Sequence, residues 1–320
     1  MFSVLNLNPA LPKGALPCAL TIGNFDGVHR GHQAMLARLK AAAAERGLPA
    51  AVMSFEPHPR EVFTPDLAPA RLTSLREKIE LFKQHGIDRL VLVHFSQRFA
   101  SLSPQDFIRQ ILLEGVQARW ILIGDDFKFG AKRAGDLALL RQTGEQQGFA
   151  VESLDSILVD GERVSSTAVR EALARGDMPK ATRLLGRPYS ISGRVVHGDK
   201  LGKELGFPTA NVQMKHNKPP LSGIFAVELA GLDGNSLQGV ASLGVRPTVK
   251  TNGAATLEVH VFDFHERIYG AHVRVDFLHK LRDEEKYPDL PALIAQIARD
   301  VVDAKNFFIN RQDAKNAKTE

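Results

Sequence analysis

The stretch TIGNFDGVHRGH, residues 21–32, decides the fold of the first half of the chain. It begins inside an apolar run, residues 18–22, that predicts a buried strand, and it leads into a helical pattern over residues 31–46. A helix that starts at a glycine-rich turn presents free amides and the positive end of its dipole to an anion. The stretch therefore predicts a phosphate site between a strand and a helix.

The polar residues of this stretch suit a polyphosphate. His29 and His32, three residues apart, can both turn toward phosphates and stabilise the charge that develops during an in-line displacement. The alternative is that both are surface histidines beside an ordinary turn. Asp26 could orient a histidine or a metal-bound water, or it could stabilise the turn itself. Three glycines let the backbone approach a ligand closely: Gly23, Gly27 and Gly31.

The rest of the first half alternates short apolar runs with longer helical ones. Further buried strands are predicted over residues 50–55, 90–95 and 120–123, and a helical stretch over residues 167–185. Strands that alternate with helices are typical of βαβ units and a mostly parallel sheet. We therefore expect an α/β domain over residues 1–186.

Beyond residue 186 the pattern changes to short strands separated by Gly, Pro and Asn. This pattern predicts a small antiparallel barrel, residues 187–310, closed by a helix over residues 290–308 and followed by a polar tail, residues 311–320. The predicted strands cover residues 189–196, 224–229, 257–262 and 273–278. The fold class is thus α/β followed by β.

Length and composition agree with two globular domains that act on small anionic molecules. A chain of 320 residues exceeds the size at which one core stops growing. Its 41 Lys and Arg against 36 Asp and Glu suit nucleotides, and their scattering disfavours nucleic acid. The single cysteine excludes an internal disulfide and fits a cytoplasmic protein. No apolar run is long enough for a membrane span, and no secretion signal is expected.

Several motifs of the first half occur in the order known from one family. FEPHPR at residues 55–60, FASLSP at 99–104, GDDFKFG at 124–130 and VSSTAVR at 164–170 follow the glycine-rich turn. Together they resemble the FMN adenylyltransferases of the nucleotidyltransferase superfamily, which implies a Rossmann-like parallel sheet. The resemblance implies ATP contacts at Gly23, Phe25, Gly27, Gly31, Ser165, Ser166, Thr167 and Arg170. It implies flavin contacts at Asn24, Phe55, His58, Asp126 and Phe127.

Two of these motifs also make sense locally. Ser165, Ser166 and Thr167 can cap the following helix, whose free amides could hold a triphosphate together with Arg170. The alternative is a plain helix cap beside a solvated arginine.

Lys128 stands where relatives often carry arginine. Lysine replaces a two-pronged donor with a point charge, which puts the affinity for flavin or phosphate in doubt.

GDKLGKELGFPTAN, residues 198–211, is similar to the fingerprint of riboflavin kinases. It contains no Walker loop, because GxxxGKE is one residue too short and carries glutamate where Ser or Thr should follow the lysine. The resemblance implies that Gly198, Gly202 and Lys203 lie over ATP. It also implies that the oxygens of Thr209 and Asn211 contact Mg²⁺, which is bound as MgATP. The alternative for these two residues is ordinary turn chemistry.

The stretch TLEVHVFDF, residues 256–264, alternates as a strand does. One predicted face carries Leu257, Val259 and Val261, and the other carries Glu258, His260 and Phe262. The resemblance makes Glu258 the general base that takes the proton of the ribityl hydroxyl. The alternative is a solvated glutamate on a half-buried strand.

Taken together, the resemblance is to the bifunctional riboflavin kinase/FMN adenylyltransferase family. It implies ATP-dependent conversion of riboflavin to FMN and then of FMN to FAD, with ADP and pyrophosphate as the other products. One alternative is that a single activity is retained while the other domain only binds flavin. A second is a non-catalytic flavin- or RNA-binding protein. The sequence leaves the oligomeric state open.

Overall fold

The computed structural model describes residues 2–7, 16–198, 202, 205–215, 218–232, 234, 236–245 and 255–316. The chain forms two compact units. The first comprises Met1–Pro69 and Leu75–Ser165, and the second comprises Ala70–Ser74 and Ser166–Glu320. Within the described ranges, none of the helices has the length and apolar character needed to cross a bilayer.

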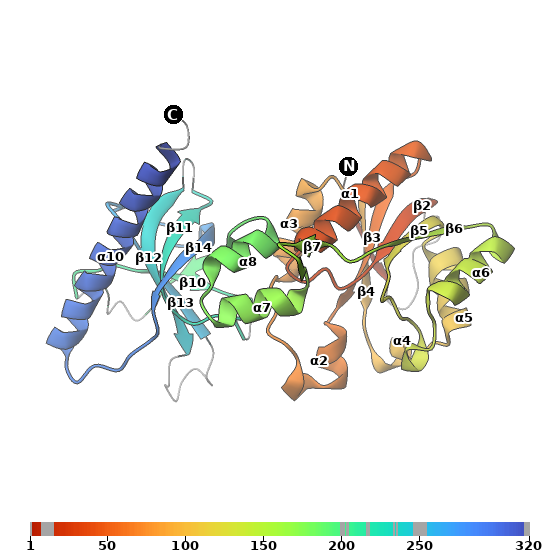
Figure 1. The fold of residues 1–320 in the computed structure, drawn as a ribbon. Helices are drawn as coiled ribbons and strands as arrows, with labels where there is room; N and C mark the ends of the chain where they lie inside the picture. The colour runs from red at the N-terminus through yellow and green to blue at the C-terminus, as the bar shows by residue number, and fades with distance from the viewer. Residues whose placement is uncertain are drawn as a thin grey trace. The chain divides into compact units, whose positions relative to one another are not determined.

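The first unit is an α/β fold around a parallel sheet (Figure 1). The strand order is β1-β4-β3-β2-β5-β6, and all five pairings between neighbours are parallel. The central strand β2 is buried at every residue, as a strand covered on both faces should be. The strands are β1 (Ser3–Leu7), β2 (Cys18–Ile22), β3 (Ala50–Glu56), β4 (Arg89–His94), β5 (Ala118–Gly124) and β6 (Ala150–Leu154).

Alternate residues of the sheet face two separate hydrophobic cores. On one face α1 (Arg30–Glu45) and α3 (Leu75–Gln84) bury residues such as Leu39 and Phe82. On the other face η2 (Phe107–Gly115) and α6 (Leu137–Gln147) cover the sheet. Shorter elements of the unit are α2 (Pro59–Phe63), η1 (Pro65–Leu67), α4 (Gln97–Ala100), α5 (Pro104–Asp106), η3 (Ala131–Arg133), β7 (Leu158–Val159) and β8 (Glu162–Arg163).

The second unit contains the closed antiparallel barrel that the sequence predicts, with strand order β10-β13-β12-β11-β14-β9. Its interior is apolar, and Phe225 and Phe277 meet edge to face at 5.2 Å. The strands are β9 (Tyr189–Val196), β10 (Ala210–Gln213), β11 (Gly223–Ala230), β12 (Leu237–Val245), β13 (Ala255–Val261) and β14 (His272–Arg282).

Two helical expectations need correction. The stretch over residues 167–185 is two helices, α7 (Ser166–Ala174) and α8 (Met178–Leu185), because Gly176 adopts a left-handed φ of 74° and Asp177 caps α8. The closing helix α10 (Leu290–Asn316) does not end near residue 308 but runs into the expected tail.

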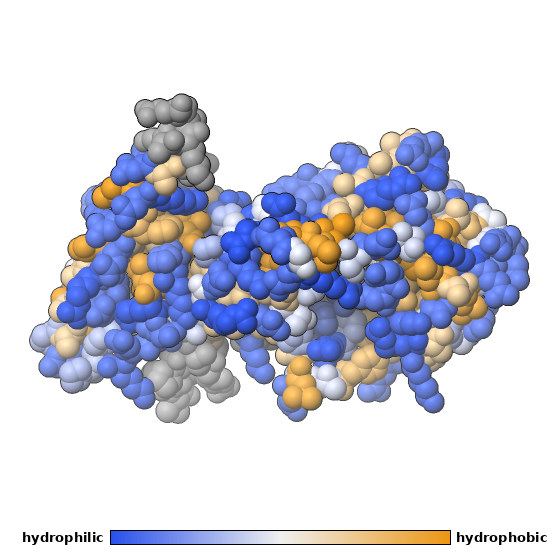
Figure 2. Space-filling view, viewed as in Figure 1, coloured by the Kyte–Doolittle hydropathy of each residue, from blue (hydrophilic) through white to orange (hydrophobic). Residues whose placement is uncertain are grey.

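The last turns of α10 are held to the barrel by an ion pair. Arg311 donates from Nη1 to Glu228 Oε1 of β11 at 3.0 Å. The side of α10 visible in Figure 2 is mainly hydrophilic. The last turns read NRQDAKN, so the sequence of this end looks like a polar tail although the backbone is helical. Apolar periodicity alone could not have placed this end.

Candidate functional sites

The glycine-rich turn between β2 and α1 is built from buried residues in an unusual backbone conformation. Phe25 and Val28 have positive φ angles of 49° and 40°, and neither side chain is exposed. Residues other than glycine occupy this region only where surrounding packing enforces it, and such positions cluster at functional sites. The turn is therefore held in one shape before any ligand arrives.

His29 and His32 lie together at the start of α1. Their rings stack with centroids 3.7 Å apart, and the His32 amide donates to His29 Nδ1 at 3.3 Å, which caps the helix. A Cβ atom on Gly31 would lie only 3.3 Å from the His29 ring, so glycine provides the room for this arrangement. The two histidines of the predicted phosphate site are thus adjacent.

The chemistry of His32 is set by its burial. Burial first, then the neighbouring charges of His29 and Lys78, lower its pKa well below the usual 6.5, so the ring is neutral at pH 7. Its Nδ1 atom is buried and has no hydrogen-bond partner in the described part of the chain. A buried polar atom without a partner is costly, and a ligand at this turn could supply one.

A buried cation that the sequence did not predict lies at this turn. Lys78 of α3 is only 3% exposed, and its ammonium donates to the Asn24 carbonyl at 2.9 Å. Ser54 Oγ donates to the same carbonyl at 3.2 Å. A buried positive charge favours a bound polyphosphate. The available signal was a lysine on the apolar face of a helix, three residues before the buried Leu81.

The five predicted flavin contacts lie around one cavity of about 840 Å³ in the first unit. Its walls are rich in phenylalanine, and Phe55 lies 5.7 Å from Phe95 and 6.0 Å from Phe99 between ring centroids. Aromatic walls of this kind fit a planar ring system. The five residues are Asn24, Phe55, His58, Asp126 and Phe127.

Two of these residues have additional partners. His58 caps α2, where its Nδ1 accepts from the Arg60 amide at 3.2 Å. Asp126 forms an exposed ion pair of 2.6 Å with Arg163. Lys128, the position noted for its departure from relatives, pairs with Asp136 at 3.3 Å and also lines the cavity.

The predicted triphosphate motif falls at the division between the two units. Ser165 ends the first unit, while α7 begins at Ser166 in the second. Arg170 donates from Nε to the Ala70 carbonyl at 2.6 Å, also within the second unit. Thr167 lies in the first turn of α7. The contribution of these residues to ATP binding stays a prediction.

The polar residues predicted for the barrel come together on its outer face. Thr209 Oγ1 donates to Glu258 Oε2 at 3.3 Å, and Asn211 is the direct cross-strand neighbour of Glu258. Hydroxyl, amide and carboxylate oxygens are the ligands that Mg²⁺ prefers. This donor set therefore fits the metal.

Two glycines of the predicted nucleotide-binding segment, Gly198 and Gly202, lie close to the same residues. A Cβ atom on Gly198 would overlap the Asn211 side chain, and one on Gly202 would lie 3.1 Å from Thr209 Oγ1. Only glycine allows the backbone to come this close. Lys203, the third residue predicted to contact ATP here, lies outside the described residues.

Glu258 faces a pocket of about 280 Å³ between the barrel wall and α10. The strand alternation is as predicted, because Leu257 and Val259 are 1% and 0% exposed inside the barrel. Part of the pocket wall is apolar, with Ile224 from β11 and Ile297 from α10, and part carries charged side chains, among them Arg282 and Asp300. A carboxylate beside an apolar wall suits a ligand with both a ring system and hydroxyl groups.

Comparisons with known proteins agree with this organisation. The family described as FAD synthetase matches residues 12–168, and the family described as riboflavin kinase matches residues 185–308. A bifunctional riboflavin kinase/FMN adenylyltransferase of Escherichia coli is 48% identical over 95% of this chain and 96% of its own length. The protein of that description from Pseudomonas fluorescens is 50% identical over 90% of this chain and 92% of its own length.

Among solved structures, a protein from Streptococcus pneumoniae described as a macrolide-efflux protein covers 93% of this chain and 97% of its own, with 28% identity and a TM-score of 0.77. This likeness concerns the fold. A parallel α/β unit with a histidine-capped turn and a barrel with an oxygen-lined pocket define a two-unit protein suited to nucleotide-dependent transfer. The chain belongs to the bifunctional riboflavin kinase/FMN adenylyltransferase family.

Proposed function

We propose that the barrel unit phosphorylates riboflavin to FMN and that the parallel-sheet unit adenylylates FMN to FAD, both with ATP. The observation that carries the proposal is that Thr209 and Glu258 line one pocket of a barrel that matches riboflavin kinases, with Asn211 directly opposite Glu258 on the neighbouring strand. The paired histidines His29 and His32 support the proposed adenylyl transfer in the other unit, which matches FAD synthetase.

In the kinase step the ribityl hydroxyl oxygen attacks the γ-phosphorus of ATP. The bond between that phosphorus and the β–γ bridging oxygen breaks, and ADP leaves with the electron pair. Glu258 accepts the proton of the attacking hydroxyl. Its hydrogen bond from Thr209 and its place on a strand fix the direction of the carboxylate.

Magnesium belongs to this proposal as MgATP. The oxygens of Thr209 and Asn211 would hold it, and the bound ion would neutralise phosphate charge. Gly198 and Gly202 lie so close to Asn211 and Thr209 that a Cβ atom would not fit, which suits the nucleotide contacts proposed for these two glycines.

In the adenylyl transfer a phosphate oxygen of FMN attacks the α-phosphorus of ATP, and pyrophosphate leaves. No proton transfer to the enzyme is needed, so positioning and charge stabilisation carry the catalysis. His29, His32 and the amides at the start of α1 would contact the phosphates. The phenylalanine-walled cavity, with Asn24 and Phe127 in its lining, would hold the flavin ring.

The proposal includes a cytoplasmic location, because the single cysteine forms no disulfide within the chain, as is usual in a reducing compartment. Cys18 is a free buried thiol, and burial raises its pKa to about 11, so it stays protonated and unreactive.

Product analysis tests the two steps separately. FMN with MgATP should release pyrophosphate, whereas riboflavin with MgATP should release ADP first. A protein that only binds flavin or RNA would consume no ATP, and RNA binding would weaken steeply with salt. Flavin binding or RNA binding without any consumption of ATP would overturn the proposal.

A further inference from the structure

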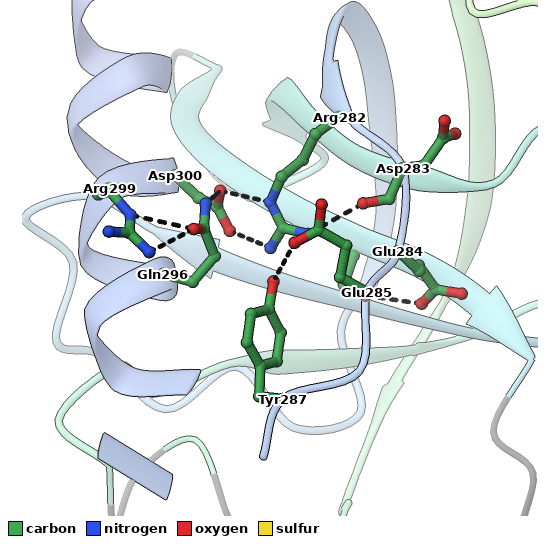
Figure 3. A network of polar contacts seen from close by, with 9 residues as sticks. Arg282, Asp283, Glu284, Glu285, Tyr287, Gln296, Arg299 and Asp300 are labelled. Carbon is green, nitrogen blue, oxygen red and sulfur yellow. Dashed lines mark hydrogen bonds and ion pairs between the residues drawn. The ribbon is translucent and has the colours of Figure 1, made fainter. Parts of the chain in front are cut away.

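Arg282 ends β14 at the rim of the pocket that contains Glu258 (Figure 3). Its guanidinium forms a two-pronged ion pair with Asp300 of α10, with Nε to Oδ1 at 2.8 Å and Nη2 to Oδ2 at 2.6 Å. The Asp300 residue is only 4% exposed. Fork-to-fork geometry of this kind fixes orientation as well as distance. Arg282 therefore ties the end of a barrel strand to the closing helix.

The same guanidinium also holds the segment between β14 and α10. Residues 283–289 are neither helix nor strand. Arg282 Nη1 donates to the Asp283 carbonyl at 2.9 Å, and its guanidinium carbon lies 5.9 Å from the centre of the Tyr287 ring. Tyr287 in turn donates to Glu285 Oε2 at 3.2 Å, and burial raises the pKa of its hydroxyl, which therefore stays protonated. One side chain thus contacts the connecting segment at two places, Asp283 and Tyr287.

The Asp300 carboxylate accepts three hydrogen bonds. Besides the two bonds from Arg282, Gln296 donates from Nε2 to Oδ1 at 2.9 Å, and Arg299 donates to Gln296 Oε1 at 3.0 and 2.7 Å (Figure 3). Buried polar networks whose members all have partners make a structure rigid and specify one arrangement. The helix is therefore locked in one rotation relative to the barrel strand.

Six residues that line the pocket belong to the connecting segment or to α10, the two parts that Arg282 contacts: Glu284, Glu285, Tyr287, Leu293, Ile297 and Asp300. We propose that Arg282 is a positioning residue for riboflavin, which prebuilds the pocket wall formed by the connecting segment and α10. The proposal rests on the kinase activity proposed above. A wall ordered in advance lowers the entropy lost on binding, so its benefit appears in affinity.

Loss of Arg282 should affect the KM for riboflavin and the kcat of the kinase differently. Glu258 and Thr209 lie on or beside other strands, and the hydrogen bond between them does not involve Arg282. Arg282→Met should therefore raise the riboflavin Kd and KM by at least about tenfold and change kcat by less than about threefold. Riboflavin fluorescence quenching gives the Kd without turnover, and ADP release gives the kinetic constants.

Removal of Arg282 alone leaves Asp300 buried without its charged partner, which can unfold the unit. The double variant Arg282→Met with Asp300→Leu removes both charges and still removes the contacts to Asp283 and Tyr287. Far-UV circular dichroism melting establishes that it is folded. The matched control is Arg274→Met, which breaks another two-pronged pair on β14, with Asp276, away from the pocket.

A folded double variant with at least about tenfold weaker riboflavin binding, beside an unchanged Arg274→Met variant, supports the proposal. Wild-type affinity in the double variant overturns it, as does a fall in kcat with KM unchanged. If the wild-type protein binds riboflavin without phosphorylating it, the kinase assignment fails, and the binding data alone then decide the role of Arg282.

Discussion

Thr209 and Glu258, 49 residues apart in sequence, share a hydrogen bond of 3.3 Å on the outer face of the barrel. The bond joins the residue proposed to hold magnesium to the residue proposed to take a proton. Because one hydrogen bond joins the two side chains, the proton acceptor and the metal ligand can act on the same pair of groups, the ribityl hydroxyl and the phosphate that it attacks.

Glu258→Gln keeps the size of the side chain but removes its ability to accept a proton. We expect FMN formation from riboflavin to fall by about 10²- to 10⁴-fold, because that is the usual contribution of a general base. FMN supplied directly should still become FAD at the wild-type rate. Glu228→Gln is the matched control, since Glu228 is a barrel carboxylate that pairs with Arg311 away from the pocket. Unchanged kinase activity in Glu258→Gln would remove Glu258 as the base.

His29→Ala combined with His32→Ala should stop FAD synthesis while FMN accumulates from riboflavin. The reason is that both rings lie at the start of α1 and belong to the parallel-sheet unit alone. Chromatography of the flavins over time measures both products. His94→Ala, at an exposed histidine of the same unit, serves as the control. Loss of both activities in the double variant would point to general damage instead.

The lowered pKa of His32 predicts that the free energy of unfolding of the first unit falls at acidic pH. In the unfolded chain this histidine takes up a proton as the pH falls below about 6.5, whereas in the folded unit it resists protonation. Its contribution to stability is therefore complete above pH 6.5 and is lost as the pH falls toward the folded pKa. His32→Asn should remove this part of the acid sensitivity.

The single tryptophan makes this measurement specific to one unit. Trp120 is 2% exposed in the core of the first unit, so its fluorescence follows the unfolding of that unit. Denaturant midpoints at pH 7.5 and 5.5 should differ less in His32→Asn than in the wild type. Equal differences in the two proteins would show that His32 is not the group responsible.

Lys78→Met should lower adenylyl transfer by at least about tenfold and leave the kinase unchanged. The substitution keeps the apolar stem but removes the buried charge and the hydrogen bond to Asn24. Lys78→Arg should restore part of the activity because it restores the charge. The initial rate of pyrophosphate release with FMN as substrate measures the effect. Full activity in Lys78→Met would show that the buried charge has no role in transfer.

The sequence predicted the strands that carry a strong local pattern. Cys18–Ile22 and Tyr189–Val196 are found with the predicted bounds, one from continuous apolar residues and the other from alternation. The missed strands lacked such signals. Ser3–Leu7 is mostly exposed at the edge of the sheet, and Leu237–Val245 contains Gly239 and Gly244, which are typical of loops.

The same limit applies to the sites. The glycine-rich turn and the strand of Glu258 could be located because each motif is local in sequence. Lys78 reaches the turn from a helix 54 residues further on, and Arg282 meets Asp300 only because the chain folds back as α10. Contacts of this kind depend on tertiary packing, and a single sequence carries no pattern that specifies them.

The most direct test of the account is a time course of the purified protein with riboflavin and MgATP, with the flavins separated by chromatography, beside a second run started from FMN. The account predicts that FMN appears first and FAD follows, and that the second run gives FAD without delay. Conversion of FMN but not of riboflavin would contradict the assignment of the barrel. Flavin binding without any conversion would contradict both assignments.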